Sequence, residues 1–290
     1  MCMFGLQRRH KKNRIKKTLK LPIIKQKGID LFIDNTGTKV EIKFGNAQHI
    51  GGRLKQEDSF GYSNISDSMK ISQKGVLAVL ADGMGGLSYG KEISEYVISA
   101  ALSMFENLNY SQPFYIQIEN IIRKINNEVS NRFSKNGKSD AGSTIVLAFI
   151  YKTKLYWASV GDSRLYLLRD GYLYQINEDH DYLNHLLEAV INGNITLTEA
   201  LADPQKNSLT SFIGNEKLPY IDISLKGFSI QRGDKIILCS DGVYNSISDA
   251  EFIELLKKEP QVSADRIIRS IVSKKLNNQD NITIMIINYD

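Results

Sequence analysis

The sequence has few cysteines, no long apolar segment and no internal repeat. Cys2 and Cys239 are its two cysteines and lie far apart, so neither a disulfide framework nor a thiolate metal site is indicated. No apolar run reaches the length of a membrane-spanning helix, and the N-terminus lacks the apolar core of a signal peptide. Cysteine usage therefore favours a reducing, cytoplasmic setting.

The positive charge is concentrated near the N-terminus. Residues 1–30 carry ten Lys or Arg and one acid, a balance of +9, whereas the whole chain has a formal charge of +5, so the remainder carries about −4. A basic run can contact nucleic acid, anionic lipid or an acidic partner, but most such runs are simply solvated. We expect a flexible basic extension over 1–38, able to contact an anionic surface and without a specific nucleic-acid partner, before a single domain over 39–290.

Within that domain, runs of β-branched and alternating apolar residues predict strands. Apolar stripes at helical spacing predict two helices, over 93–108 and 118–133, and Ser248 with Glu251 forms a capping-box pattern that opens another helix. A last helix is expected over 266–276, and a loop-helix excursion near 181–204. The strands are expected over 40–47, 58–63, 76–81, 143–151, 154–160, 164–177 (as a hairpin), 236–240 and 282–287. Because helices do not alternate regularly with single strands, we expect segregated α+β layers.

Three of the predicted strands have an aspartate at one end. Asp82-Gly83 follows the strand over 76–81, Asp241-Gly242 follows that over 236–240, and Asp280-Asn281 precedes that over 282–287. Each pair alone is also a common turn sequence. If the strand ends converge, however, their hard oxygen ligands suit Mg²⁺ or Mn²⁺ rather than zinc.

The sequence immediately after Asp82 is rich in glycine. Gly83, Gly85 and Gly86 place no side chains around that aspartate. We expect them to adopt positive φ and to let the backbone approach a ligand or an ion.

Three further segments contain polar residues that can act together with these three aspartates. Arg53 can bind phosphate bidentately, while Glu57 and Asp58 can orient waters on a metal ion; the alternative is a surface turn with local ion pairs. Asp162, in a Gly-Asp step between two predicted strands, is either a fourth metal carboxylate or a turn residue. The small residues of Gly142-Ser143-Thr144 are expected to serve packing rather than catalysis.

From about residue 40 to 289 the chain resembles the metal-dependent protein phosphatases, the type 2C serine/threonine class, in their bacterial form. The motifs that carry the resemblance occur in the family's order: RLKQED, VLADGMGG, AGSTIV, ASVGDSRLY, DH at 179–180, LTSFIG, IILCSDGVYNSIS and DNITIMI. The resemblance implies an α+β fold, a four-layer α-β-β-α sandwich whose two central, mostly antiparallel sheets are flanked by helices. It also implies a metal cluster at one end of the sandwich, where water attacks a phosphoserine or phosphothreonine.

The resemblance assigns a role to each candidate residue. Asp82 would bridge two Mn²⁺ or Mg²⁺ ions with the Gly83 carbonyl completing one site, Asp241 and Asp280 would hold the second ion, and Asp162 with Asp241 would form a weaker third site. Glu57 and Asp58 would act through bound waters, and Arg53 would bind the substrate phosphate. The implied partners are phosphoproteins, as targets of a serine/threonine kinase, and the chain is expected to be a monomer.

Some positions depart from the family's pattern. Gln56 replaces an Asn, and Met84 replaces the histidine that eukaryotic members use as a general acid, which would leave protonation of the leaving group to metal-bound water. Residues 211–213 differ from the commoner Arg-Ala-Leu, and His180 is expected to be structural. Residues 181–207 occupy the family's flap position, where variation would alter substrate choice.

Two other functions fit parts of the sequence. Residues 85–91 match the start of a phosphate-binding loop of nucleoside triphosphatases, but Glu92 replaces the expected Ser or Thr. A catalytically weak phosphoprotein-binding scaffold of the same fold is the other alternative, and the intact set of Asp82, Asp241 and Asp280 argues against it.

Overall fold

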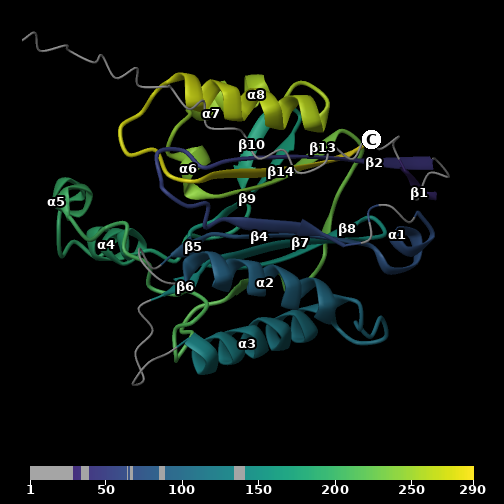
Figure 1. The fold of residues 1–290 in the computed structure, drawn as a ribbon, viewed down its shortest axis with the longest axis horizontal. Coiled ribbons are helices and arrows are strands. Elements are labelled where there is room, and N and C mark those ends of the chain that lie inside the picture. Colours follow the sequence, from purple (N-terminus) through teal and green to yellow (C-terminus); the bar gives the residue numbers. More distant parts are fainter. Residues whose placement is uncertain (1–28, 34–38, 64, 66–67, 85–88, 134–140) are drawn as a thin grey trace, which may run out of the picture.

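The computed structural model describes residues 29–33, 39–63, 65, 68–84, 89–133 and 141–290. Two six-stranded sheets lie face to face, with helices covering both outer faces (Figure 1). The first sheet has the strand order β1-β2-β14-β13-β9-β10, and the second has the order β11-β8-β7-β4-β3 with β12 also paired to β8. Each of these pairings is antiparallel. The expected four-layer α-β-β-α sandwich is thus confirmed.

The elements have the following bounds. The first sheet contains β1 Ile29–Ile33, β2 Lys39–His49, β14 Ile282–Tyr289, β13 Asp234–Cys239, β9 Arg164–Arg169 and β10 Tyr172–Gln175. The second contains β11 Asp222–Ile223, β12 Phe228–Ser229, β8 Lys154–Val160, β7 Ile145–Tyr151, β4 Val76–Ala81 and β3 Ser59–Tyr62, and β5 Gly83–Met84 pairs separately with β6 Gly142–Ser143. The helices are α1 Ser68–Lys74, α2 Gly90–Phe105, α3 Phe114–Phe133, α4 Tyr182–Ile191, α5 Leu197–Ala202, α6 Asp241–Tyr244, α7 Asp249–Leu255 and α8 Pro260–Ser273.

Strands with apolar residues on both faces form the centre of each sheet. In β4, Leu77 and Val79 pack toward the layer of α2 and α3, whereas Ala78 and Leu80 pack between the two sheets. In β14, Met285 and Ile287 likewise lie in the core between the sheets, and its alternate residues lie beneath α7 and α8. A strand that is covered on both faces reads as a continuous apolar run, which is why β4, β13 and β14 were predictable from sequence.

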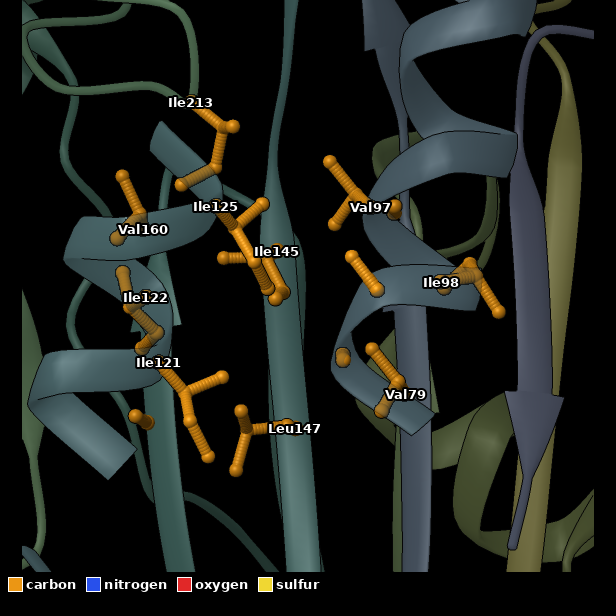
Figure 2. Close-up of a cluster of buried hydrophobic side chains, with 14 of the residues drawn as sticks. Val79, Val97, Ile98, Ile121, Ile122, Ile125, Ile145, Leu147, Val160 and Ile213 are labelled. Carbon is orange, nitrogen blue, oxygen red and sulfur yellow. The ribbon is translucent and has the colours of Figure 1, made fainter. Parts of the chain in front are cut away.

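The apolar stripes of α2 and α3 cover the outer face of the second sheet. Figure 2 shows Ile122 and Ile125 of α3 near Ile145 of β7, and Val97 and Ile98 of α2 near Val79 of β4. These side chains are almost fully buried, and burying one Val or Ile contributes about 1.5–3 kcal/mol. The core anchors both helices, so the loops at the strand ends rest on a rigid frame.

Some boundaries differ from the predictions. The strand β1 lies inside the segment assigned to the extension, because it pairs with β2 and widens the first sheet; residues 1–28 lie outside the described residues. The last helix begins at Pro260 rather than 266, since proline is well suited to a first helical turn. Ser248 caps α7 as expected, but the Glu251 side chain binds Ser270 and Lys274 in place of the reciprocal capping bond.

The predicted excursion forms two short helices, α4 and α5, which project from one end of the sandwich (Figure 1). Asp181 caps α4, and Thr196 with Glu199 forms a complete capping box at α5 that the sequence analysis did not identify. No side chain of α4 is buried, and Ala200 is the one buried residue of α5, so this pair of helices adds little to the core. None of the helices in the described part of the chain is long and apolar enough to cross a membrane.

Candidate active site

The sheet pairings bring the ends of six strands to one end of the sandwich. The C-terminal end of β4 lies opposite the start of β3, and the C-terminal end of β13 lies opposite the start of β14. The end of β8 lies opposite the start of β7, which in turn pairs with the end of β4. The carboxylates beside these termini therefore gather in one region: Asp58, Asp82, Asp162, Asp241 and Asp280.

The backbone of Asp82 is fixed by the segment that opens β7. The backbone N–H of Asp82 donates to the Thr144 hydroxyl at 2.9 Å, and the Ser143 hydroxyl and the Thr144 N–H donate to the Asp82 carbonyl at 3.0 and 2.9 Å. Thr144 is linked further to the Ser163 hydroxyl at 2.7 Å. Ser143 and Thr144 thus hold a candidate catalytic residue in place, beyond the packing role expected of them. Two hydroxyl residues at the start of a buried strand were the sequence signal.

Gly83 lies in the β5–β6 pairing and does not have positive φ, contrary to the expectation for the glycines after Asp82. Its requirement is close approach, because a Cβ there would stand 2.2 Å from the Gly90 carbonyl oxygen and 2.7 Å from that of Glu57. Gly85 and Gly86 lie outside the described residues. Gly242 is equally restricted, since a Cβ would stand 1.9 Å from the Asn281 carbonyl oxygen. The backbone at Gly83 and at Gly242 therefore packs directly against a neighbouring backbone segment, with no room for a side chain.

Asp58 is buried and is held by only one of its two carboxylate oxygens. Its Oδ2 accepts hydrogen bonds from Ser240 at 2.8 Å and from Thr283 at 2.6 Å, whereas Oδ1 is buried without a hydrogen-bond partner. Burial raises the pKa of Asp58, against the lowering effect of these two donors. Sequence reasoning missed Ser240 and Thr283, although Ser240 directly precedes Asp241 and Thr283 follows Asp280 by three residues.

Asn281 organises the loop that carries Arg53 and Glu57. Its side-chain oxygen accepts from the Glu57 N–H at 2.7 Å, and its amide donates to the carbonyls of Ile50 and Lys55 at 2.9 and 3.0 Å. The asparagine of the Asp280-Asn281 pair therefore fastens the loop to the start of β14. In the predicted motif only the aspartate had been given a role.

Arg53 is half exposed, and its guanidinium donates to Asp280 Oδ2. This ion pair joins the predicted phosphate ligand, Arg53, to a predicted metal ligand, Asp280. Because the pair is open to solvent, it contributes at most about 1 kcal/mol.

Several of the carboxyl groups at this end of the sandwich are destabilised in their charged form. Burial, and then the charges of Asp58, Asp241 and Asp162, raise the pKa of Asp82 well above its ordinary value. Burial and the neighbouring Asp241 raise the pKa of Asp162 to about 7. The pKa of Asp241 is also raised, by burial and by Asp280. Like charges this close disfavour joint ionisation unless a cation lies among them.

The donor chemistry of these residues fits hard divalent cations. All the candidates offer oxygen, and Asp241 Oδ1, like Asp58 Oδ1, is buried without a hydrogen-bond partner. Among the described residues, however, no three His, Cys, Asp or Glu side chains are arranged as a group that could hold a metal ion. The fit therefore rests on the unpartnered oxygens and the crowding of negative charge.

The other predicted residues have the following places. Glu57 lies beside the start of α2, with its Oε1 3.0 Å from where a Cβ on Gly90 would lie. Gln56 accepts from the Asp58 N–H at 3.4 Å, while its own Nε2 is buried without a partner. His180 is buried and its Nδ1 accepts from the Gly161 N–H at 3.2 Å, an arrangement that suits a structural role. Most of the phosphate-loop match over 85–91 lies outside the described residues.

Comparisons with known proteins identify the family of this chain. The family model for protein phosphatase 2C matches residues 46–279. The serine/threonine phosphatase stp of Listeria monocytogenes is 29% identical over 248 residues, which cover 82% of this chain and 93% of that protein. The solved structure of the S. agalactiae serine/threonine phosphatase has a TM-score of 0.73 at 26% identity, over 86% of this chain and 100% of that one.

A second solved structure is that of the catalytic domain of the serine/threonine protein phosphatase PstP in complex with two manganese ions. It has a TM-score of 0.66 at 25% identity, over 86% of this chain and 99% of that one. The family match extends over most of the chain and includes every candidate site residue except Asp280. This chain therefore belongs to the protein phosphatase 2C family of serine/threonine protein phosphatases.

Proposed function

We propose that the protein hydrolyses phosphoserine and phosphothreonine esters in proteins, with water as the nucleophile, at a centre of Mn²⁺ or Mg²⁺ ions. The observation that carries this proposal is the convergence of five carboxylates at one end of the sandwich, with the pKa of Asp82 and of Asp162 raised by burial and by neighbouring charge. Carboxylates this close repel one another unless cations lie among them. Two divalent ions are the means by which many phosphatases act on phosphoesters.

The proposed ligand roles are those that the family resemblance implies, and the places of the aspartates beside strand ends support them. Asp82, whose pKa is raised by burial and by the charges of the other four aspartates, would be the bridging ligand, with the Gly83 carbonyl completing one site. Asp241 and Asp280 would hold the second ion, Asp162 with Asp241 would hold a weaker third, and Glu57 and Asp58 would act through water. When bound, the ions supply positive charge that activates the attacking water and stabilises the phosphoryl oxygens.

Arg53 is the proposed phosphate ligand. Its side chain is 53% exposed, so it is open to an approaching substrate, and it already donates to an oxyanion, the Asp280 carboxylate. Because that ion pair is weak, a phosphoryl group presenting two oxygens to the guanidinium fork can displace it.

The proposed partners are phosphoproteins, as targets of a serine/threonine kinase. We propose that the protein acts in the cytoplasm, a reducing setting that its cysteine usage favours. We also propose that it is a monomer and that its basic N-terminal segment contacts an anionic surface. Two observations on the described residues argue against the nucleoside triphosphatase alternative: β4 and its neighbours pair antiparallel, and Lys91 pairs with Glu95.

The test is phosphate release from a phosphothreonine peptide in Mn²⁺ and in EDTA. We expect turnover only with Mn²⁺, and we expect Arg53→Ala to raise KM by about tenfold or more, because Arg53 binds phosphate in ground and transition states alike. The matched control is Arg123→Ala, which removes an exposed arginine that pairs with Glu119 on α3 and should leave KM unchanged. Turnover in EDTA, or a pure kcat defect in Arg53→Ala, would contradict these assignments.

A further inference from the structure

Arg164 and Tyr244 form a stacked pair between the two segments that carry Asp162 and Asp241. Arg164 begins β9 two residues after Asp162, and Tyr244 ends α6 three residues after Asp241. The guanidinium carbon lies 3.6 Å from the centroid of the tyrosine ring. The tyrosine hydroxyl donates to the backbone carbonyl of Asp162 at 3.1 Å.

The orientation of Arg164 is set by several bonds. Its Nε and Nη2 donate to Asp179 Oδ2 at 2.9 and 2.6 Å, and its Nη1 donates to the Tyr166 hydroxyl at 3.0 Å. Gln175 also donates to Asp179, at 2.9 Å. With Arg164 26% and Asp179 10% exposed, this bidentate pair is shielded from solvent, so the guanidinium presents a fixed face to Tyr244.

Strand pairing brings the segments of Asp162 and Asp241 together but does not include either residue. Asp162 follows β8 of the second sheet and precedes β9 of the first, and β9 pairs with β13 up to Arg164 opposite Cys239. Asp162 and Asp241 both lie beyond this last position of the β9–β13 register. The bond from Tyr244 to the Asp162 carbonyl joins the two segments at this point.

We propose that Arg164 and Tyr244 are positioning residues that fix Asp162 relative to Asp241, so that both carboxylates can serve one cation. The inference rests on the proposed function, since it assumes that the two aspartates bind metal. Arg164 orients the tyrosine ring, and the tyrosine hydroxyl holds the loop of Asp162. Outer residues that orient metal ligands commonly change metal affinity by 10- to 100-fold when they are replaced.

The chain offers a matched control on the same strand. Arg169, at the other end of β9, makes a bidentate pair with Asp234 and lies 5.0 Å over the Phe228 ring. Arg169→Lys removes an equivalent fork and stack away from the site. It should lower thermal stability about as much as Arg164→Lys does, without changing Mn²⁺ affinity.

The experiment measures Mn²⁺ binding by calorimetry and the Mn²⁺ dependence of p-nitrophenyl phosphate hydrolysis in the same full-length preparations. Tyr244→Phe keeps the ring and loses one hydrogen bond, so we expect the weakest Mn²⁺ binding step to weaken by about 3- to 10-fold. Arg164→Lys should weaken the same step. In an Asp162→Ala background, Tyr244→Phe should have no additional effect, because there is no carboxylate left to position.

The outcomes separate this inference from the proposed function. A wild-type protein that neither binds Mn²⁺ nor hydrolyses the ester overturns the proposed function, and the inference with it. If the wild type does both, unchanged Mn²⁺ affinity in Tyr244→Phe overturns the inference alone. A loss of equal size in the Asp162→Ala background, or in Arg169→Lys, also overturns it.

Discussion

Asp58 accepts two hydrogen bonds on one oxygen and none on the other. Ser240 and Thr283 both donate to Oδ2, whereas Oδ1 is buried without a hydrogen-bond partner. A buried carboxylate that is fastened on one side only is suited to bind a water or an ion on the other. The two hydroxyls therefore fix the orientation of the Asp58 carboxylate.

We expect Ser240→Ala to raise the Mn²⁺ concentration needed for half-maximal hydrolysis by about tenfold. We also expect it to lower the free energy of unfolding by about 1–3 kcal/mol, because a buried carboxylate loses a donor. The measurements are Mn²⁺ titration of hydrolysis and denaturant unfolding. Ser263→Ala is the control, since that buried hydroxyl donates to the Lys258 carbonyl under α8. Equal Mn²⁺ dependence in both variants would show that Ser240 is merely structural.

His180 gives a pH dependence of stability that can be isolated by mutation. Burial, opposed by the charges of Asp179 and Glu178, lowers the pKa of His180 below its ordinary value of 6.5. The unfolded state therefore takes up the proton first as the pH falls, so this contribution to stability is complete above about pH 6.5 and declines below it. His180→Asn can keep an acceptor for the Gly161 N–H but cannot titrate.

We predict that the wild type loses more unfolding free energy between pH 7.5 and 5 than His180→Asn does, measured by urea denaturation in EDTA. The comparison cancels the titration of the other groups, which both proteins share. An identical pH dependence in the two proteins would show that His180 is not the titrating group.

At the scale of elements, the site depends on how closely β5 approaches the start of α2. Gly83→Ala would place a Cβ 2.2 Å from the Gly90 carbonyl oxygen, so the two segments must separate. We expect a loss of stability of about 1–3 kcal/mol and a loss of at least 100-fold in kcat/KM.

Gly233→Ala is the control for this variant. It has φ of +87° and open space around it, so the change should reduce stability by about 1–2 kcal/mol through backbone strain and leave turnover intact. Thermal unfolding and phosphopeptide hydrolysis check both variants. Full activity in Gly83→Ala would show that the approach of β5 to α2 is not required.

The elements also show what the sequence could predict. The strand β4 was predicted to the residue because it is apolar on both faces and ends at Asp82. The strand β1 was missed because its lysine-rich surroundings resemble a solvated tail, and only the pairing with β2 makes it part of the sheet. Asp82, Asp241 and Asp280 follow from local pattern together with the family resemblance. The roles of Thr144, Ser240 and Tyr244 depend on contacts with residues distant in sequence, which no local pattern encodes.

At the scale of the whole molecule, the end of the sandwich concentrates negative charge at the junction of both sheets. A cation that binds only the folded state stabilises it by about 2.7 kcal/mol at 100 times its Kd. For a domain of this size that corresponds to a Tm rise of roughly 5–10 °C. We expect such a rise when Mn²⁺ is added to EDTA-treated protein, measured by calorimetry, and a much smaller one in Asp82→Asn. An equal rise in both proteins would place the cation elsewhere.

The central claim is that the converging carboxylates form the metal centre of a phosphatase. Its most direct test is Mn²⁺-dependent phosphate release from a phosphothreonine peptide by the wild type, Asp82→Asn and Asp241→Asn, with folding checked by circular dichroism. The predicted result is a fall of at least 1000-fold in kcat for both variants with the fold retained, because a ligand of the reaction centre is lost. Wild-type turnover in either folded variant would contradict the claim.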